Sequence, residues 1–275
     1  QNKLSAGNMT DKTSNNIIRD SVPAKFLAEA LGGYGYDYEG GYKINSVKDA
    51  ATGKDLPFTI NFTMMRIDLP APLKTGETYK FSVAWSYREY DRMKYDERGG
   101  YEYFPDDDNR LYTCAQWFPR MCVFDDYEGW QNKQFLGRGE YALTFGNYKV
   151  RITVPSDFIV GATGWLQNPQ EVLSKDQLER FNKAQKTFDK PVMIVTESEA
   201  RKNEKSRSKK KSTWVFHSEN VRDVAFAASR KFIWDAMAVK VGTKTPLAQS
   251  LYPKEGNQLW EKESTKAIKN TLEVY

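Results

Sequence analysis

Apolar and polar residues alternate along most of this chain, in short runs separated by turn sequences. Phe81, Val83 and Trp85 alternate with polar residues, and the same pattern runs through 148–154 before Pro155. Neighbouring side chains in a β-strand point to opposite faces, so a period of two predicts strands with one buried face. Turn sequences such as ATGKD link the runs. The pattern therefore predicts a mainly β fold of twisted antiparallel β-sheets, packed as a sandwich or saddle.

One stretch in the second half of the chain has the period of a helix instead. Ser174 and Gln177 have the spacing of a capping box, and Phe181 lies on a loose apolar stripe that follows them. We expect a helix near 174–188. Together with the basic segment that follows, it forms an insertion at about 168–212 in the β domain.

The end of the sequence also changes period. Trp260, Ile268 and Leu272 recur at helical spacing and predict an amphipathic C-terminal helix. We assign 1–250 to one β domain, and 251–275 to a linker and this helix. We expect the apolar face of the helix to be under-packed, because it is shaped to meet a further domain of a longer protein.

The net charge of +5 comes from a single run. Residues 199–211 hold seven Lys and Arg and two Glu, so the rest of the chain balances to zero. Such a run predicts an exposed, mobile loop and gives no basic face for nucleic acid. The sequence also has no apolar run near the ~18 residues that cross a bilayer. We therefore predict no nucleic-acid partner and no membrane span.

The few possible metal ligands and nucleophiles limit what chemistry this chain can perform. His217 is the one histidine, whereas a histidine-based zinc site or a triad requires more partners. Cys114 and Cys122 are eight residues apart, which leaves open whether they form a disulfide. The aspartates at 106–108 lack the alternate spacing of a calcium loop and predict a solvated loop.

The stretch TCAQWFPRMCVFDDYEGW (113–130) concentrates aromatic and polar residues. We predict that Trp117, Phe118 and Phe124 belong to the core.

The order of these features resembles the amino-terminal β domain of the aminopeptidase N family of zinc metallopeptidases. A strand leads to Gln116, then to the segment PRMC (119–122) and an acidic pair at 125–126; a later strand ends in Pro155 and a small-residue strand follows. The segment VRDVAFAASRKFIWDA resembles the family's transition towards its catalytic domain, and the tail resembles that domain's first helix. The resemblance covers about 34–275.

The resemblance implies a non-catalytic domain that forms one wall of a peptide-binding cleft. Gln116 then binds the amino end of the peptide substrate, and the partner is the protein's own catalytic domain, which this sequence does not include. Zinc is expected in that missing domain, on an H-E-x-x-H helix that has no counterpart here. We expect this chain alone to hydrolyse no peptide and to hold no catalytic metal. The family also implies an extracytoplasmic bacterial protein, periplasmic or secreted.

A second interpretation is a free-standing β-sandwich binding module for a carbohydrate or protein ligand. In that case the three tryptophans Trp117, Trp130 and Trp165 would stack on ligand rings. An apolar stripe on the C-terminal helix favours the first interpretation, since a self-contained module has no use for it.

Overall fold

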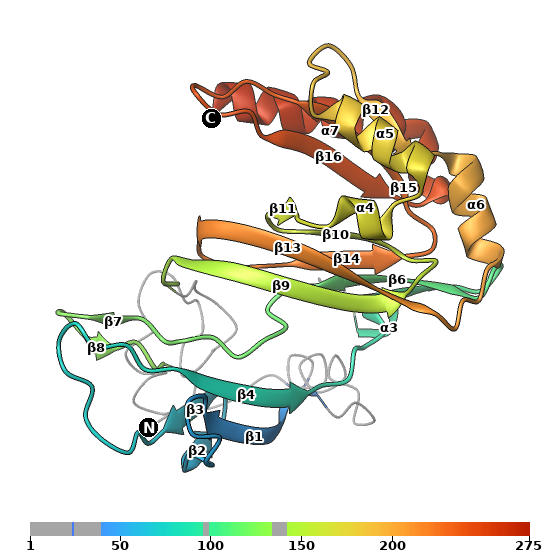
Figure 1. Cartoon of the computed structure of the whole chain (residues 1–275). Helices are drawn as coiled ribbons and strands as arrows, with labels where there is room; N and C mark the ends of the chain where they lie inside the picture. The colour runs from blue at the N-terminus through green and yellow to red at the C-terminus, as the bar shows by residue number, and fades with distance from the viewer. Residues whose placement is uncertain (1–23, 25–39, 96–98, 134–141) are drawn as a thin grey trace. The chain divides into compact units, whose positions relative to one another are not determined.

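The computed structural model describes residue 24 and residues 40–95, 99–133 and 142–275 (Figure 1). Strands account for 38% of the chain and helices for 22%, and every pair of named strands in the described part is antiparallel. The predicted mainly β, antiparallel fold is confirmed. None of the helices in these residues has the length and apolar character needed to cross a membrane.

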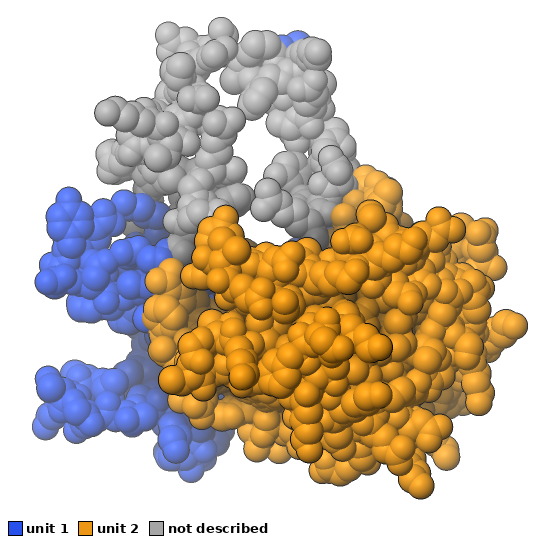
Figure 2. Space-filling model, turned by 90° about the horizontal axis from the view of Figure 1, so that it is seen from above, with its two compact units in different colours: residues 1–90, 120–144 blue, residues 91–119, 145–275 orange. Residues whose placement is uncertain are grey.

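The chain divides into two compact units, which are coloured separately in Figure 2. Unit 1 comprises residues 1–90 and 120–144, and unit 2 comprises residues 91–119 and 145–275. The stretch 113–130 is therefore shared between the units. The predicted boundary at 250/251 stays a prediction.

The described residues of unit 1 form three two-stranded sheets, β1-β4, β2-β3 and β7-β8. Val47 on the first sheet is 2% exposed and pairs with Val83. The predicted ATGKD turn forms because the Asp49 carboxylate accepts hydrogen bonds from the amides of Ala51 and Thr52. The strands are β1 (Lys43–Asp49), β2 (Phe58–Asn61), β3 (Met64–Ile67), β4 (Phe81–Ser86), β7 (Phe124–Asp125) and β8 (Gly129–Trp130).

Unit 2 contains three sheets, with strand orders β10-β14-β6-β5, β11-β13-β9 and β12-β15-β16. Its strands are β5 (Gly100–Phe104), β6 (Asn109–Cys114), β9 (Gly146–Pro155), β10 (Ile159–Ala162), β11 (Trp165–Leu166), β12 (Val192–Val195), β13 (Lys211–Val221), β14 (Phe226–Ser229), β15 (Ile233–Ala238) and β16 (Leu247–Tyr252). Its helices are α3 (Arg92–Tyr95), α4 (Pro169–Val172), α5 (Lys175–Ala184), α6 (Glu197–Lys205), η1 (Lys254–Gly256) and α7 (Asn257–Val274).

One hydrophobic core joins the three sheets of unit 2. The β13 residues Trp214 and Phe216 point into it, together with Val160 from β10 and Trp234 from β15. Thr213, Val215 and His217 alternate with them and lie on the opposite face, which is half-buried, so this sheet has one buried face and one solvent-facing face, called here the wet face.

Strand β15 is buried along its whole length because both of its faces are covered. Trp234 and Ala236 face the main core, while Ile233 packs with Ala200 of α6, and Met237 packs with residues of α7. This explains why the segment shows no alternation of burial although it is a strand.

The inserted helix is confirmed as α5. Both bonds of the predicted capping box are present between Ser174 and Gln177. The helix buries Phe181 and Ala184 against β12 and β15. A second capping box, from Thr196 and Glu199, begins α6.

The predicted mobile loop at 199–211 is wrong. Its first half belongs to α6, which buries Ala200 and Glu204, and β13 begins at Lys211. Arg207 between them donates hydrogen bonds to the backbone carbonyls of Glu204, at 2.6 Å, and of Asp107, at 2.8 Å. The capping box of α6 and the hydrogen bonds of Arg207 order this segment, although its net charge predicted a solvated loop.

The C-terminal helix is present as α7, but its apolar face is not bare as expected. Ile268 and Leu272 pack against β15 and β16. Thr265 is 1% exposed and donates to the Asp235 carboxylate at 2.5 Å. Figure 1 shows α7, in red, lying along β16. Leu259, by contrast, stays 64% exposed.

We expect Thr265→Val to loosen α7. Valine has the shape of threonine but cannot donate to Asp235, and a buried polar group left without its partner costs about 1–3 kcal/mol. Hydrogen exchange should become faster along α7, and the urea midpoint should fall. Thr271→Val is the matched control, because the Thr271 hydroxyl is exposed and donates to Ala267 of its own helix. Equal effects of the two substitutions would contradict the docking role of Thr265.

Candidate functional site

Gln116 lies in unit 2, two residues after the end of β6, where the chain leaves the sheet. Its side chain is exposed. On one side Cys114 is buried and pairs with Phe226 of β14. On the other side the Trp117 indole donates a hydrogen bond to the Val224 carbonyl oxygen at 3.0 Å. The exposed amide is thus carried by a short segment that is held at both ends.

The backbone of Gln116 adopts a left-handed conformation with φ of +53°. Four described non-glycine residues share this feature, and two of them, Asp108 and Asn220, are of types that tolerate it. A glutamine there costs of order 1 kcal/mol, and such strain persists only where the surroundings impose it. The strain at Gln116 therefore directs attention to this residue as a candidate functional position.

The aromatic residues that follow give a mixed outcome. The Trp117 ring lies 5.1 Å from the Phe118 ring and 5.4 Å from the Phe226 ring, so it packs as predicted, though only half-buried. Phe124 belongs to unit 1 and is 63% exposed, so its predicted place in the core is wrong. Its strand, β7, has two residues and pairs with the equally short β8, and the Phe124 ring lies 5.1 Å from the Trp130 ring.

The acidic pair after Phe124 caps a turn. The Asp125 carboxylate accepts hydrogen bonds from the Glu128 amide, at 2.7 Å, and the Tyr127 amide, and from the Gln131 side chain. These bonds, the one from Glu128 first, lower the pKa of Asp125. A carboxylate that is already satisfied by its own turn has a structural role.

The two cysteines each keep their thiol, so no disulfide joins them. Cys114 is buried in unit 2, while Cys122 lies in unit 1 with its Sγ 3.7 Å from the Met64 Sδ. Burial raises the pKa of the Cys122 thiol, which disfavours the reactive thiolate.

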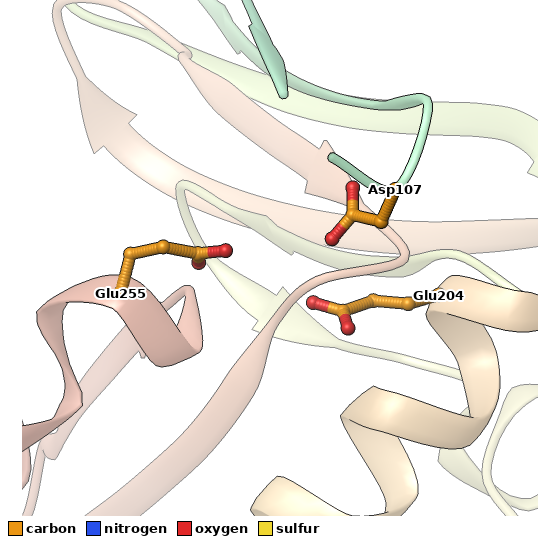
Figure 3. Close-up of side chains that lie close together, drawn as sticks. All are labelled: Asp107, Glu204 and Glu255. Carbon is orange, nitrogen blue, oxygen red and sulfur yellow. The ribbon is translucent and has the colours of Figure 1, made fainter. Parts of the chain in front are cut away.

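Asp107, Glu204 and Glu255 direct their carboxylates towards one another (Figure 3). They come from the β5–β6 turn, the end of α6 and η1, and in the described residues they form the one group of three possible metal ligands. The prediction of a solvated loop at 106–108 is therefore wrong for Asp107, which is 21% exposed and holds this position.

Two lysines already balance this carboxylate cluster. The Lys231 Nζ contacts Asp107 and lies 2.9 Å from both Glu204 and Glu255, while the Lys254 Nζ lies 2.7 Å from Glu204 and 3.0 Å from Asp107. Their ammonium groups take the place that a cation would occupy. The ligands also lack the nitrogen and sulfur atoms that zinc prefers, so the cluster does not fit a catalytic zinc.

Paired in this way, Asp107 is strongly acidic. Burial alone would raise its pKa, but hydrogen bonds from Lys231, Lys254 and Asn109 outweigh burial and lower the pKa to about 2. No local signal in the sequence marks this cluster, because its members are far apart along the chain.

His217 lies within β13 and faces the side of the sheet that is turned away from the core. There it lines a groove of about 550 Å³ with Lys149 and Arg151 of β9 and with Glu171 of α4. No other histidine exists to complete a zinc site, so His217 is part of a basic surface and not of a metal centre.

No protein-family model matches the sequence, and no curated protein matches it. Among solved structures, the chain is similar to an M1 zinc metallopeptidase from Deinococcus radiodurans, with 14% identity and a TM-score of 0.44. A point mutant of that enzyme, bound to a Tyr-Ser-Ala substrate, gives the same values. A two-domain M1 zinc metallopeptidase mutant bound to L-tryptophan is 13% identical, with a TM-score of 0.44.

Each of these matches covers 83% of this chain, which spans only 42–43% of the length of those proteins. The similarity is a distant resemblance of fold, and it assigns no role to any residue of this chain.

We expect Gln116→Gly to stabilise the chain. Glycine adopts a positive φ without steric cost, so the change should raise the free energy of unfolding by about 0.5–1 kcal/mol. Urea unfolding of the purified chain measures this. Gln170→Gly, at an exposed position of α4, is the control and should destabilise. A loss of stability at position 116 would show that the glutamine side chain is itself structural.

We expect the carboxylate cluster to make the fold sensitive to acid. The folded pKa of Asp107 lies below its unfolded value of about 3.9, so its contribution is present above about pH 4 and is lost as pH falls towards 2. A shift of this size corresponds to about 2 kcal/mol. Asp107→Asn should therefore be less stable than wild type at neutral pH, and the difference should shrink towards pH 2.

Urea unfolding between these pH values measures the difference, and Asp106→Asn, at the exposed neighbouring position, is the control. If Asp107→Asn kept the full acid dependence of the wild type, Asp107 would not be the titrating group.

Proposed function

We propose that this chain is the non-catalytic amino-terminal β domain of a zinc aminopeptidase-like protein, and that it forms one wall of a peptide-binding cleft. The observation that carries the proposal is the placement of Gln116. Its amide is exposed on a strained backbone that is anchored by Cys114 and Trp117, at the position the sequence resemblance assigns to substrate binding.

The chemistry of the amide suits the amino end of a peptide. The Gln116 side-chain oxygen accepts a hydrogen bond from the α-ammonium group, and its nitrogen donates to a backbone carbonyl. A carboxylate in its place would bind the ammonium more strongly but would repel the peptide's own acidic groups. The fixed backbone limits the entropy lost on binding, which is the purpose of a preorganised contact.

The catalytic chemistry then belongs to a separate domain. Zinc bound there would supply an activated water and a polarised carbonyl. The described residues of this chain offer no matching ligand set, so their part is to position substrate. Leu259 and the 42%-exposed Trp260 of α7 would contact that domain. We place the whole protein outside the bacterial cytoplasm, in the periplasm or secreted, as the resemblance implies.

The test uses the full-length protein that contains this chain. Gln116→Ala should raise KM for an aminoacyl chromogenic substrate about tenfold, the order of one lost hydrogen bond to a charged group, with zinc content unchanged. Gln116→Asn keeps the amide and the tolerance for positive φ, and should lose less. Gln170→Ala controls for removal of an exposed glutamine.

Three outcomes would count against the proposal. If the full-length protein has no peptidase activity, the proposed assignment to a zinc aminopeptidase is wrong. An unchanged KM in Gln116→Ala would show that Gln116 does not bind the substrate. Lost zinc in the same variant would make the residue structural.

A further inference from the structure

The wet face of the β11-β13-β9 sheet carries an ordered set of side chains that the proposed peptidase role does not use. Antiparallel partners point to the same side, so the pairs form rows across the sheet. Lys149 pairs with His217, and His217 pairs with Trp165 on its other side. In the next row Arg151 pairs with Val215.

Strand β11 approaches β13 closely because a glycine precedes it. Gly164 has φ of +99°, and a Cβ there would lie 2.4 Å from the His217 carbonyl oxygen. No other residue fits this position without moving the strand. The half-exposed Trp165 is therefore held next to His217 by the backbone itself.

The wall of the groove is fixed by Asn168, which is 6% exposed. Its side chain replaces a strand backbone: it donates to the Thr213 carbonyl at 2.9 Å and accepts from the Val215 amide at 3.0 Å. It also donates to Glu171 at 2.8 Å, which fixes that carboxylate at the edge of the groove. Gln167 lines the same wall.

The two cations of this groove lie close together on β9. Lys149 and Arg151 are two residues apart on one strand face, a spacing of about 7 Å, and like charges so placed repel each other. Within the described residues neither has a carboxylate at ion-pair distance. An anionic group placed between them would relieve the repulsion, and Arg151 can bind a carboxylate through two parallel bonds.

Glu171 restricts what else the ligand contains. A fixed carboxylate at the wall would repel an anionic group placed next to it, such as a phosphate of nucleic acid, but it accepts hydrogen bonds from hydroxyl groups. Trp165, which pairs with His217 and is 50% exposed, offers a flat apolar face beside the residues that line the groove. A ligand that fits all three features has a carboxylate, several hydroxyls and a ring with an apolar face.

We propose that this groove binds an acidic carbohydrate of the uronic-acid type. The sugar carboxylate lies between Lys149 and Arg151, its ring stacks on Trp165, and its hydroxyls donate to Glu171 and bond to Gln167. The site lies wholly within unit 2 and is independent of Gln116 and of any catalytic domain.

The test is a nuclear magnetic resonance titration of the purified chain with trigalacturonate. Maltotriose serves as a neutral sugar of equal length, inorganic phosphate as a plain anion, and glycine as a small zwitterion. Trigalacturonate should give saturable shifts at the amides of Lys149, Arg151 and Val215 and at the Trp165 indole. The three other probes should bind at least tenfold more weakly.

Matched variants complete the experiment. Arg151→Gln should weaken trigalacturonate binding at least tenfold, while Lys209→Gln, which removes an exposed charge elsewhere, should not. Absence of saturable shifts with trigalacturonate would overturn the proposal. Equal binding of phosphate would show that the groove is a non-specific anion site. Equal binding of maltotriose, or equal affinity of Arg151→Gln and Lys209→Gln for trigalacturonate, would show that the groove does not recognise the sugar carboxylate.

Discussion

The buried ammonium group of Lys231 is the constraint on which the arrangement of unit 2 depends. Its side chain is 0% exposed, and an unpaired charge in such a place would cost several kcal/mol. The cost is offset only if carboxylates surround it. Asp107, Glu204 and Glu255 supply them from three separate segments, and the Phe104 ring lies 4.4 Å from the same nitrogen. One side chain thus fixes the β5–β6 turn, α6 and η1 around the turn between β14 and β15.

The same cluster explains why the basic run is ordered. Glu204, in the last turn of α6, forms buried ion pairs with Lys231 and Lys254. The end of α6 is thereby fixed, and Arg207, which follows it, donates to the backbone carbonyls of Glu204 and Asp107. The acidic members of the 199–211 segment therefore control its structure, although its basic members dominate its composition. The net charge of a segment describes how it interacts with bulk solvent. It does not predict the structure of a segment in which one residue of the opposite charge, here Glu204, is buried.

Local rules predicted what is locally determined. The period of two predicted strands β4 and β9, and the capping box at Ser174 predicted α5, because neighbouring residues decide these features. The capping box of α6 follows the same rule at Thr196, but the basic residues after it hid the signal.

Other features depend on partners distant in sequence. Lys231 meets Asp107 across 124 residues, and no periodicity encodes that meeting. The exposure of Phe124 likewise depends on which element covers β7. For the candidate site, the family resemblance directed attention to Gln116, whereas its strained backbone and its two anchors are visible only in the structure.

The docking of α7 shows how a polar network selects one face of a helix that has apolar residues on several sides. Hydrophobic burial is non-directional, so Ile268 and Leu272 alone do not exclude a rotated helix that buries Leu259. Asp235 excludes it. This carboxylate is 1% exposed, burial raises its pKa, and it accepts hydrogen bonds from Thr265 and from Tyr252, so any rotation that removes Thr265 leaves it under-satisfied.

Ser250 extends the restriction, because its hydroxyl oxygen lies within hydrogen-bond distance of the hydroxyl oxygens of Thr265, at 2.8 Å, and Ser264, at 3.0 Å. The outward position of Leu259 and Trp260 is therefore imposed by the network and is not a failure of packing. An apolar surface held outward in this way is available to a neighbouring domain at no cost in helix rearrangement.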